Sequence, residues 1–445
     1  MLLGAVKARL DCCKPQERIA TLGFDAMSLT EALRYHEHLD RVVGFEDVGA
    51  CGRTGKVANQ ALVGVVRGII GSWKLPIAYY LIRDNPSQDR FQCLVNECLA
   101  AVHEVGVDVR VLTCDQERTQ WAWLKKAGVT ADQPYFSHPV TKQPVYVIPD
   151  PPHCLKNARN ALRRHDIMYA QGRFARWADF VQLVDLECSR ELRAAPKLSR
   201  EHVELPIGRN MSVKLAAQTF SRSSAAAIRT YVRLGDMCEA ALSTADFMER
   251  VNDAFDCANG TSPNAPVHKA ALCADNMVGK VAELRCHAEW IATWRFFQHS
   301  DKKESHRHQF HIGWQVALRA MAQLSPLLIL GGLSFVPLRR LGQDHVENLF
   351  CCVRGRNGYN SRPDCSAFRP ALRACALTSM LKPISGGGNC EEDGDKLLVN
   401  ILEKASWDCR TGRAHRAAST ATALVQSLLG DGVDLDDGDS STVPR

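Results

Sequence analysis

IATLGFD at residues 19–25, ALVGVVRGIIGSW at 61–73 and LPIAYYLI at 75–82 are apolar runs separated by turn-forming residues, with a further run, RVVGFEDVG, at 41–49. Short runs rich in β-branched and aromatic residues between turns predict strands, and three antiparallel strands fit this stretch. Residues 89–105 then carry apolar residues at helical spacing, and the apolar run VDVRVLTCD follows at 107–115. The chain therefore begins with an α/β domain that has a mixed sheet.

Three strands, a helix and a further strand are the order of the ribonuclease H (RNase H) fold, in which acidic residues stand where central strands end. Another strand, PVYVIPD, ends at Asp150, and KNARNALRR (156–164) begins a helix. Long helical stretches, including 215–242 and 244–260, then predict an all-α insertion of about one ordinary domain's size. We divide the chain into an N-terminal extension (1–17), the first part of an RNase H-like domain (18–152), the helical insertion (153–341), the C-terminal helical part of the RNase H-like domain (342–383) and a largely disordered tail (384–445).

Composition narrows the class of protein. With 445 residues, 46% of them hydrophobic, the chain can bury a large core and form more than one domain. Its 55 Lys and Arg residues exceed its 49 Asp and Glu residues, and this surplus permits binding to a polyanion without requiring it. Eighteen cysteines in a long chain without a signal sequence favour a reduced, intracellular protein. The cysteine spacing predicts no zinc finger, and we expect no membrane segment.

Three acidic residues are candidate metal ligands. Asp25 follows IATLGF, Asp115 follows VRVLTC, and Glu347 lies on a predicted late helix over 343–354. Mg²⁺ and Mn²⁺ prefer hard oxygen ligands, so a cluster of carboxylates can hold two such ions for phosphodiester chemistry. The alternative is that the two aspartates only cap turns or helices, which is the commoner role of aspartate at a strand end.

Four motifs, in one order, carry a resemblance to a known family. They are GFDAMSL (23–29), FSHPVTKQPVYVIPDPPHCLKNARNAL (136–162), KLAAQTFSRSSAAAIR (214–229) and GQDHVENLFCCVRGRNGYNSRP (342–363). Together they resemble P-element transposases and the related THAP-domain-containing transposases. The resemblance implies that Asp25, Asp115 and Glu347 are the catalytic, metal-binding triad, using Mg²⁺ or Mn²⁺. It also implies a helical insertion that binds GTP without needing to hydrolyse it.

The resemblance further implies which residues hold the nucleotide. They are Lys197, Val213, Ser221, Phe255, Asp256, Asn259 and Asp344. The ring of Phe255 could stack on a purine, and the carboxylate of Asp256 could accept hydrogen bonds from N1–H and the exocyclic amine of guanine, a donor pair that adenine lacks. Two positions depart from the family pattern: Glu191 replaces a shorter acidic residue, and Ser212 stands where a lysine is expected beside the phosphates.

Other polar motifs have two interpretations. His153 and Lys156 of DPPHCLKNARN could face a phosphate, although a capping role at a strand-to-helix junction is favoured. The histidines of SHRHQFH (305–311) could hold zinc, although a hydrophilic loop is favoured. The arginines around Glu347 could contact DNA phosphates or be solvated; they are Arg339, Arg340, Arg354, Arg356 and Arg362.

We therefore expect a nuclear DNA transposase core of the DDE/D type that cleaves and transfers DNA strands with divalent metal and GTP. Its partners would be transposon ends and target DNA, and it would act as a homo-oligomer. No THAP-type cysteine and histidine pattern precedes Asp25, so we expect a chain shortened at its N-terminus. The alternatives are a catalytically silent, transposase-derived DNA-binding protein and a guanine-nucleotide-binding regulator.

Overall fold

The predicted strands form the centre of an eight-stranded mixed sheet with the order β5-β4-β7-β6-β1-β8-β10-β9. Its antiparallel centre consists of β1 (Ile19–Ser28), β6 (Gln60–Gly68) and β7 (Lys74–Ile82). On the other side of β1 follow two parallel neighbours, β8 (Asp108–Cys114) and β10 (Pro144–Val147), and then β9 (Tyr135–Ser137). The order β7-β6-β1-β8-β10 confirms the RNase H-like arrangement.

The structure, a computed structural model, describes residues 3, 7, 10, 13–37, 40–71, 73–205, 209–306 and 308–377. The predicted tail, 384–445, lies outside the described residues. The run at 41–49 does not form one strand, since it divides into β3 (Arg41–Val43), β4 (Phe45–Asp47) and the start of the 3₁₀ helix η3 (Gly49–Cys51). β4 and β5 (Arg53–Val57) form one edge of the eight-stranded sheet, whereas β3 pairs with β2 (Arg34–His36) in a separate two-stranded sheet.

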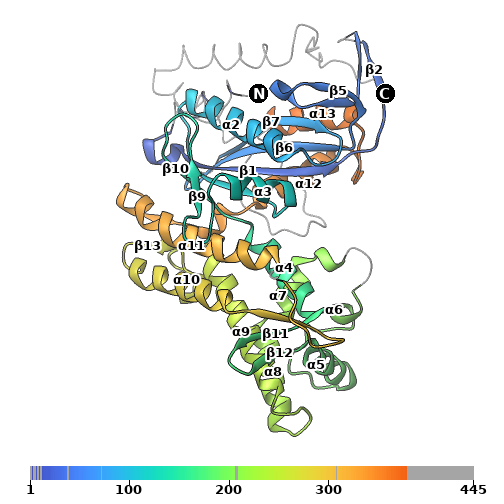
Figure 1. Ribbon diagram of the computed structural model, residues 1–445, viewed down its shortest axis with the longest axis vertical. Helices are drawn as coiled ribbons and strands as arrows, with labels where there is room; N and C mark the ends of the chain where they lie inside the picture. The colour runs from blue at the N-terminus through green and yellow to red at the C-terminus, as the bar shows by residue number, and fades with distance from the viewer. Residues whose placement is uncertain are drawn as a thin grey trace, which may run out of the picture.

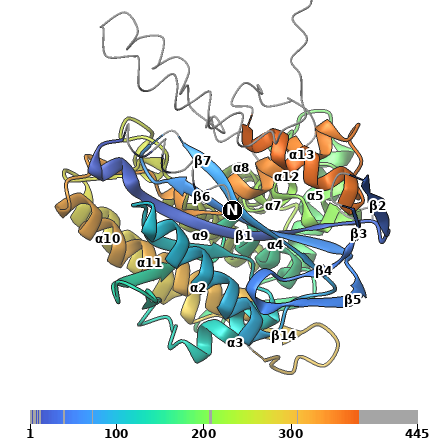
Figure 2. The ribbon, with the colours of Figure 1, turned by 90° about the horizontal axis from the view of Figure 1, so that it is seen from above.

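Helices cover both faces of the sheet (Figure 2). On one face α2 (Gln88–Glu104) and α3 (Arg118–Lys126) pack on a core that includes Phe24, Leu62 and Val66. On the opposite face α12 (Asp344–Arg356) and α13 (Cys365–Leu377) pack on Ala61, Val63 and Val65. Alternate residues of β6 thus serve two cores, since side chains in a strand point to opposite faces.

The insertion begins where β10 ends. The predicted helix at 156–164 starts earlier, at Pro151, because the side chain of Asp150 caps it by accepting a hydrogen bond from the amide of His153. This helix, α4 (Pro151–Leu162), and the long α11 (Gln309–Leu330) contact each other beside the sheet domain, and the other helices extend away from it (Figure 1). Those helices are α5 (Trp177–Ser189), α6 (Glu201–Glu204), α7 (Val213–Thr219), α8 (Arg222–Arg233), α9 (Ala241–Ala258) and α10 (Met277–Ala292).

The insertion is mostly helical, but it also contains two small sheets, which the helical periodicity did not predict. One has three strands, β12 (Arg173–Ala175), β11 (His165–Ala170) and β14 (Arg295–Gln298), and the other pairs β13 (Leu272–Cys273) with β15 (Phe335–Val336). Besides η3, the described 3₁₀ helices are η1 (Pro15–Arg18), η4 (Arg209–Met211), η5 (Val267–Lys269) and η6 (Leu338–Leu341). Within the described ranges, no helix has the length and apolar character needed to span a bilayer.

Candidate active site

Two of the predicted carboxylates lie side by side because β1 and β8 are parallel neighbours. Phe24 pairs with Cys114 in this register, so Asp25, which lies within β1, and Asp115, the first residue after β8, are neighbours. The parallel pairing of the two strands brings these two residues together. Both side chains are half-buried.

The helix α12 brings Glu347 to these two residues. A Cβ atom at Gly23 would lie 2.6 Å from Nε2 of His345 and 2.9 Å from Cγ2 of Val346, so only glycine allows α12 to approach β1 this closely. The side chain of Gln343, fully buried, donates a hydrogen bond to the carbonyl of Phe24 at 3.0 Å. Glu347 lies in the first turn of α12 and directly follows the contact residue Val346. Asp115 and Glu347 both contact His153, and both act electrostatically on Asp25, so the structure places the three carboxylates in one cluster around His153. Their oxygens do not all lie within 4.8 Å of one another.

His153 joins two of the three carboxylates. Its Nδ1 lies 2.7 Å from Oδ1 of Asp115, and its Nε2 lies 3.0 Å from Oε1 of Glu347. The favoured interpretation of this turn, a capped strand-to-helix junction, is confirmed, because Asp150 caps α4 at a proline-containing start and Lys156 is buried. The contacts of the His153 side chain were not predicted. The available signal was positional: His153 opens the helix after β10, the parallel neighbour of β8, and so lies beside the residue that follows β8.

The electrostatics of the cluster favour a cation. Burial, together with the negative charges of Asp115 and Glu347, raises the pKa of Asp25 well above its usual range. Burial opposes protonation of His153, but the charges and hydrogen bonds of Asp115 and Glu347 outweigh it and raise the pKa of the ring well above normal. Like charges this close need a counter-ion. Three carboxylates are also a donor set of the kind that Mg²⁺ and Mn²⁺ prefer, so these residues fit the implied metals.

The buried carboxylate of Asp150 joins two helices, a role that the sequence did not predict. Its Oδ2 accepts from the amide of His153 at 3.1 Å, and its Oδ1 accepts from the amide of Gln343 at 2.9 Å. Burial raises the pKa of this carboxyl to about 7. One carboxylate thus fixes the start of α4 to the start of α12, and with them the positions of His153 and Glu347.

Replacing His153 by alanine is expected to lower the free energy of unfolding by about 1–3 kcal/mol in EDTA, because the variant leaves clustered carboxylates without their partner. Mg²⁺ should restore part of this loss. The measurement is thermal unfolding with EDTA and with Mg²⁺. His299→Ala is the control, since His299 also contacts an aspartate, Asp166 at 3.4 Å, but lies on the surface of the insertion. Equal unfolding of the His153 variant and the parent in EDTA would show that the bridge contributes nothing.

The predicted nucleotide residues do not all lie in one place. Phe255, Asp256 and Asn259 lie at the end of α9, and Ser221 caps the start of α8 next to it, where Arg222 pairs with Asp253 of α9 at 2.8 Å. Val213 is the first residue of α7, capped by Ser212. Lys197 is exposed between α5 and α6, and in the described part of the chain no hydrogen bond or ion pair joins it to the other predicted residues.

A small pocket lies between the end of α9, the start of α4 and the start of α12. Its lining includes Asn259, which follows α9, Pro151 and Pro152 from the start of α4, Arg339 shortly before α12 and Asp344 at its start. Two of the predicted nucleotide residues, Asn259 and Asp344, thus share one pocket, and Asp344 is one helical turn from Glu347.

Three of the predicted nucleotide residues, one at this pocket and two on α9, already make contacts within the protein. Asp344 pairs with Arg339 at 3.0 Å. Asp256 accepts a hydrogen bond from Asn252 at 3.1 Å and lies 3.4 Å from Nζ of Lys269. Phe255 is partly buried against the core of the insertion, so its ring is only partly available for stacking.

The arginines near Glu347 do not form one uniform patch. Arg339 pairs with Asp344, and Arg340 donates to the carbonyls of Ile70 and Gly71. Arg356 and Arg362 are exposed, as a phosphate contact requires.

The SHRHQFH histidines do not gather into a metal site. Over the ranges that the structure covers, they form no group of three metal-binding side chains. His311 is fully buried, with its Nε2 close to the carbonyl of Ile291, and His308 packs on the ring of Phe296. Neither the zinc interpretation nor the hydrophilic loop describes these two residues.

Three family descriptions match the chain in order. Residues 1–128 match the TNP-like, RNase H N-terminal domain, residues 152–271 match the TNP-like, GTP-binding insertion domain, and residues 340–373 match the TNP-like, RNase H C-terminal domain. The fold is similar to that of the Drosophila P element transposase strand transfer complex, with a TM-score of 0.71 and 23% identity, covering 84% of this chain and 79% of that chain.

Two curated relatives agree with these matches. The Transposable element P transposase of Drosophila melanogaster is 23% identical over 367 residues, which cover 80% of this chain and 45% of that protein. The DNA transposase THAP9 of Homo sapiens is 24% identical over 247 residues, which cover 53% of this chain and 27% of that protein. The chain thus spans less than half the length of either relative. It belongs to the P-element-like transposase family, with an RNase H-like domain divided around a GTP-binding insertion domain.

Proposed function

We propose that this chain is the catalytic core of a DNA transposase of the DDE/D type, which cleaves DNA and transfers the freed strand end to target DNA. The observation that carries the proposal is the clustering of Asp25, Asp115 and Glu347 around His153. The two curated relatives, both named as transposases, support it.

The chemistry assigned to this site is transfer at phosphorus. Mg²⁺ or Mn²⁺ ions held by the three carboxylates would supply activation of the attacking oxygen and stabilisation of the leaving oxygen. In cleavage, a water oxygen bonds to phosphorus while the bond from phosphorus to the 3′ oxygen breaks, and that oxygen leaves as a hydroxyl. In transfer, the oxygen of this hydroxyl bonds to a phosphorus of the target DNA while the bond from that phosphorus to the target's own 3′ oxygen breaks, and the target's 3′ oxygen leaves as a hydroxyl. Asp25 and Asp115 provide fixed ligands because they stand on the central strands, while α12 positions Glu347.

The same site requires DNA close to the carboxylates. Arg356 and Arg362, which follow Glu347 and are exposed, would contact phosphates, a role that positions DNA without reading its sequence. We propose transposon ends and target DNA as partners, assembly of more than one copy on DNA, and action in the nucleus.

GTP is proposed as a cofactor that is bound but not hydrolysed. The match of residues 152–271 to a GTP-binding insertion domain supports this, as does the pocket shared by Asn259 and Asp344. Because Asp344 and Glu347 lie on one turn of α12, nucleotide binding would act on the position of Glu347. Asp256 would exchange its contact with Lys269 for the two guanine donors.

Replacing Asp256 by alanine is expected to weaken GTP binding by about 10–100-fold and ATP binding much less, since hydrogen bonds to a charged group contribute about 1.5–3 kcal/mol. Calorimetric titration of the full chain with each nucleotide measures this. Asp253→Ala is the matched control, because Asp253 lies one turn earlier on α9 and pairs with Arg222. If Asp256→Ala and Asp253→Ala bind GTP equally well, Asp256 does not recognise guanine.

The proposed activity is tested with a supercoiled plasmid carrying the DNA that flanks the gene. The chain is expected to nick it in Mg²⁺ or Mn²⁺ and not in EDTA. Binding of the plasmid without nicking would instead identify a catalytically silent DNA-binding protein. Binding of GTP without affinity for DNA at low salt would identify a nucleotide-dependent regulator.

A further inference from the structure

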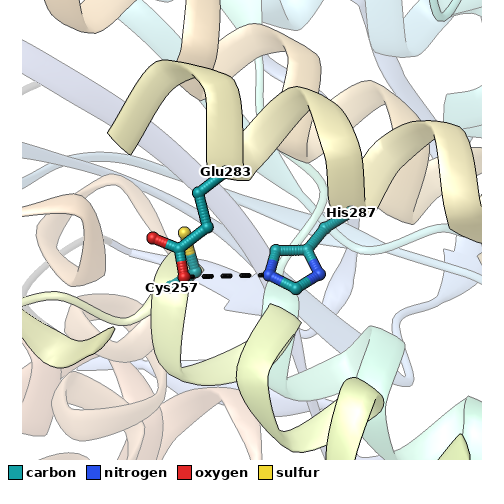
Figure 3. A group of neighbouring side chains, drawn as sticks. All are labelled: Cys257, Glu283 and His287. Carbon is teal, nitrogen blue, oxygen red and sulfur yellow. Dashed lines mark ion pairs between the residues drawn. The ribbon is translucent and has the colours of Figure 1, made fainter. Parts of the chain in front are cut away.

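A second group of metal-binding side chains lies inside the insertion, away from the three carboxylates. Cys257 comes from the end of α9, and Glu283 and His287 come from neighbouring turns of α10, on the same side of that helix (Figure 3). One sulfur, one carboxylate oxygen and one ring nitrogen from these residues all lie within 4.8 Å of one another. Three donor types therefore converge where two helices meet.

The burial of this group is unusual for polar side chains. Cys257 has no exposed surface, and His287 is 7% exposed. The Nε2 atom of His287 is 3.9 Å from Oε1 of Glu283, beyond hydrogen-bonding distance, and its Nδ1 is buried without a hydrogen-bond partner in the described structure. Buried polar groups normally have a partner, so the ring of His287 calls for an explanation.

The two oxygens of Glu283 have different surroundings. Oε1 lies between two imidazoles, 3.9 Å from His287 and 3.5 Å from Nδ1 of His268 on η5. Oε2 faces the buried ammonium of Lys280 at 3.3 Å, and Lys280 also donates to the carbonyl of His268 at 2.8 Å. Lys280 thus holds Oε2 of Glu283, while Oε1 lies near His287.

We propose that Cys257, Glu283 and His287 form a zinc site. Sulfur, imidazole and carboxylate together are a donor set for zinc, whereas Mg²⁺ and Ca²⁺ take oxygen ligands. His268 is the candidate for a fourth ligand, since its ring already approaches Glu283. Lys280 is an outer-shell residue that orients Glu283 and the backbone of His268.

The position of this site gives it a structural role. It ties the end of α9 to α10, and His268 would also attach η5. Asp256 precedes Cys257, and it pairs with Lys269, the neighbour of His268. If the proposed function is correct, zinc would therefore hold in place Asp256, the residue proposed to recognise guanine. The zinc site itself does not depend on that function, because its test needs neither DNA nor nucleotide.

The test is titration of the full-length chain with Co²⁺, a spectroscopic substitute for zinc, followed by displacement with Zn²⁺. The probe absorption is the thiolate-to-cobalt charge-transfer band, which requires a cysteine ligand. We expect one equivalent of Co²⁺ to produce the band and Zn²⁺ to remove it. Cys257→Ser should abolish the band, and His287→Gln should weaken Zn²⁺ binding at least about tenfold.

Two controls separate this site from others. Cys286→Ser changes an exposed cysteine next to His287 on α10, and Asp115→Asn changes the predicted catalytic cluster; both should keep the full band. The proposal is overturned if the unaltered chain gives no band, a result that no folding defect of a variant can explain. It is equally overturned if the band persists in Cys257→Ser, or if His287→Gln binds Zn²⁺ as tightly as the parent.

Discussion

Replacing Asp115 by alanine is expected to reduce metal-dependent strand cleavage on the order of a thousandfold, the size of loss that follows removal of one group that stabilises a transition state. Asp115 stands directly after the central strand β8, beside Asp25, and its carboxylate also contacts His153 at 2.7 Å. The variant would therefore lose a proposed metal ligand and the carboxylate that contacts the ring of His153. The measurement is the rate of plasmid nicking in Mg²⁺ and in Mn²⁺.

Asp108→Ala is the matched control for this loss. Asp108 begins the same strand at its opposite end, where its half-exposed carboxylate pairs with Arg110 at 2.8 Å. An exposed pair of this kind contributes about 0–1 kcal/mol to stability, so cleavage should be unchanged. Circular dichroism and thermal unfolding of both variants separate loss of chemistry from loss of fold. If Asp115→Ala nicks the plasmid as fast as Asp108→Ala, Asp115 is not a catalytic ligand.

Replacing Gly23 by alanine is expected to reduce cleavage about a hundredfold although it removes no polar group, since a displacement of about 1 Å at a catalytic group can cost that much. The new Cβ would lie 2.6 Å from Nε2 of His345, whose side chain is fully buried and cannot move aside freely. The helix α12 must shift away from β1, and Glu347 moves with it. Overpacking of this kind also lowers stability by about 1–3 kcal/mol.

Gly55→Ala is the control, because Gly55 lies on the edge strand β5 and a Cβ there meets nothing within 4 Å. Nicking rates and unfolding temperatures of the two variants are compared under the same conditions. Full cleavage by Gly23→Ala, at unchanged unfolding temperature, would mean that the close contact of α12 with β1 does not position Glu347.

The long strands and the two aspartates could be predicted from sequence because the signals are local. Each central strand is a continuous apolar run, and Asp25 and Asp115 stand at or just beyond the buried part of such a run. Parallel pairing then places them together with no further information. Glu347 needed the family resemblance as well, because no local marker says where on a sheet its helix packs.

The role of His153 could not be predicted, because its contacts join residues distant in sequence. Its partners Asp115 and Glu347 lie on other elements, and Glu347 is 194 positions away, so only the closed fold brings them together. The local signal, two prolines after an aspartate, correctly indicated a capped helix start but gave no information on the distant partners of His153. The cap is Asp150.

The short strands were missed for a different reason. The strands β2 to β5 have three to five residues each, and exposed residues interrupt their apolar pattern. β4 and β5 lie at the edge of the large sheet, and β2 and β3 form a separate pair. The strands of the insertion, such as β13 with two residues, are likewise too short for their periodicity to be distinguished from that of the helices around them. Their pairing depends on tertiary contacts.

The most direct test of the central claim is a count of Mn²⁺ ions bound to the full chain, measured by electron paramagnetic resonance, because it needs no knowledge of the DNA sequence. We expect Mn²⁺ to bind at the cluster of Asp25, Asp115 and Glu347, and Asp25→Asn, Asp115→Asn and Glu347→Gln each to weaken that binding. Mn²⁺ binding that is unchanged in all three variants would contradict the account.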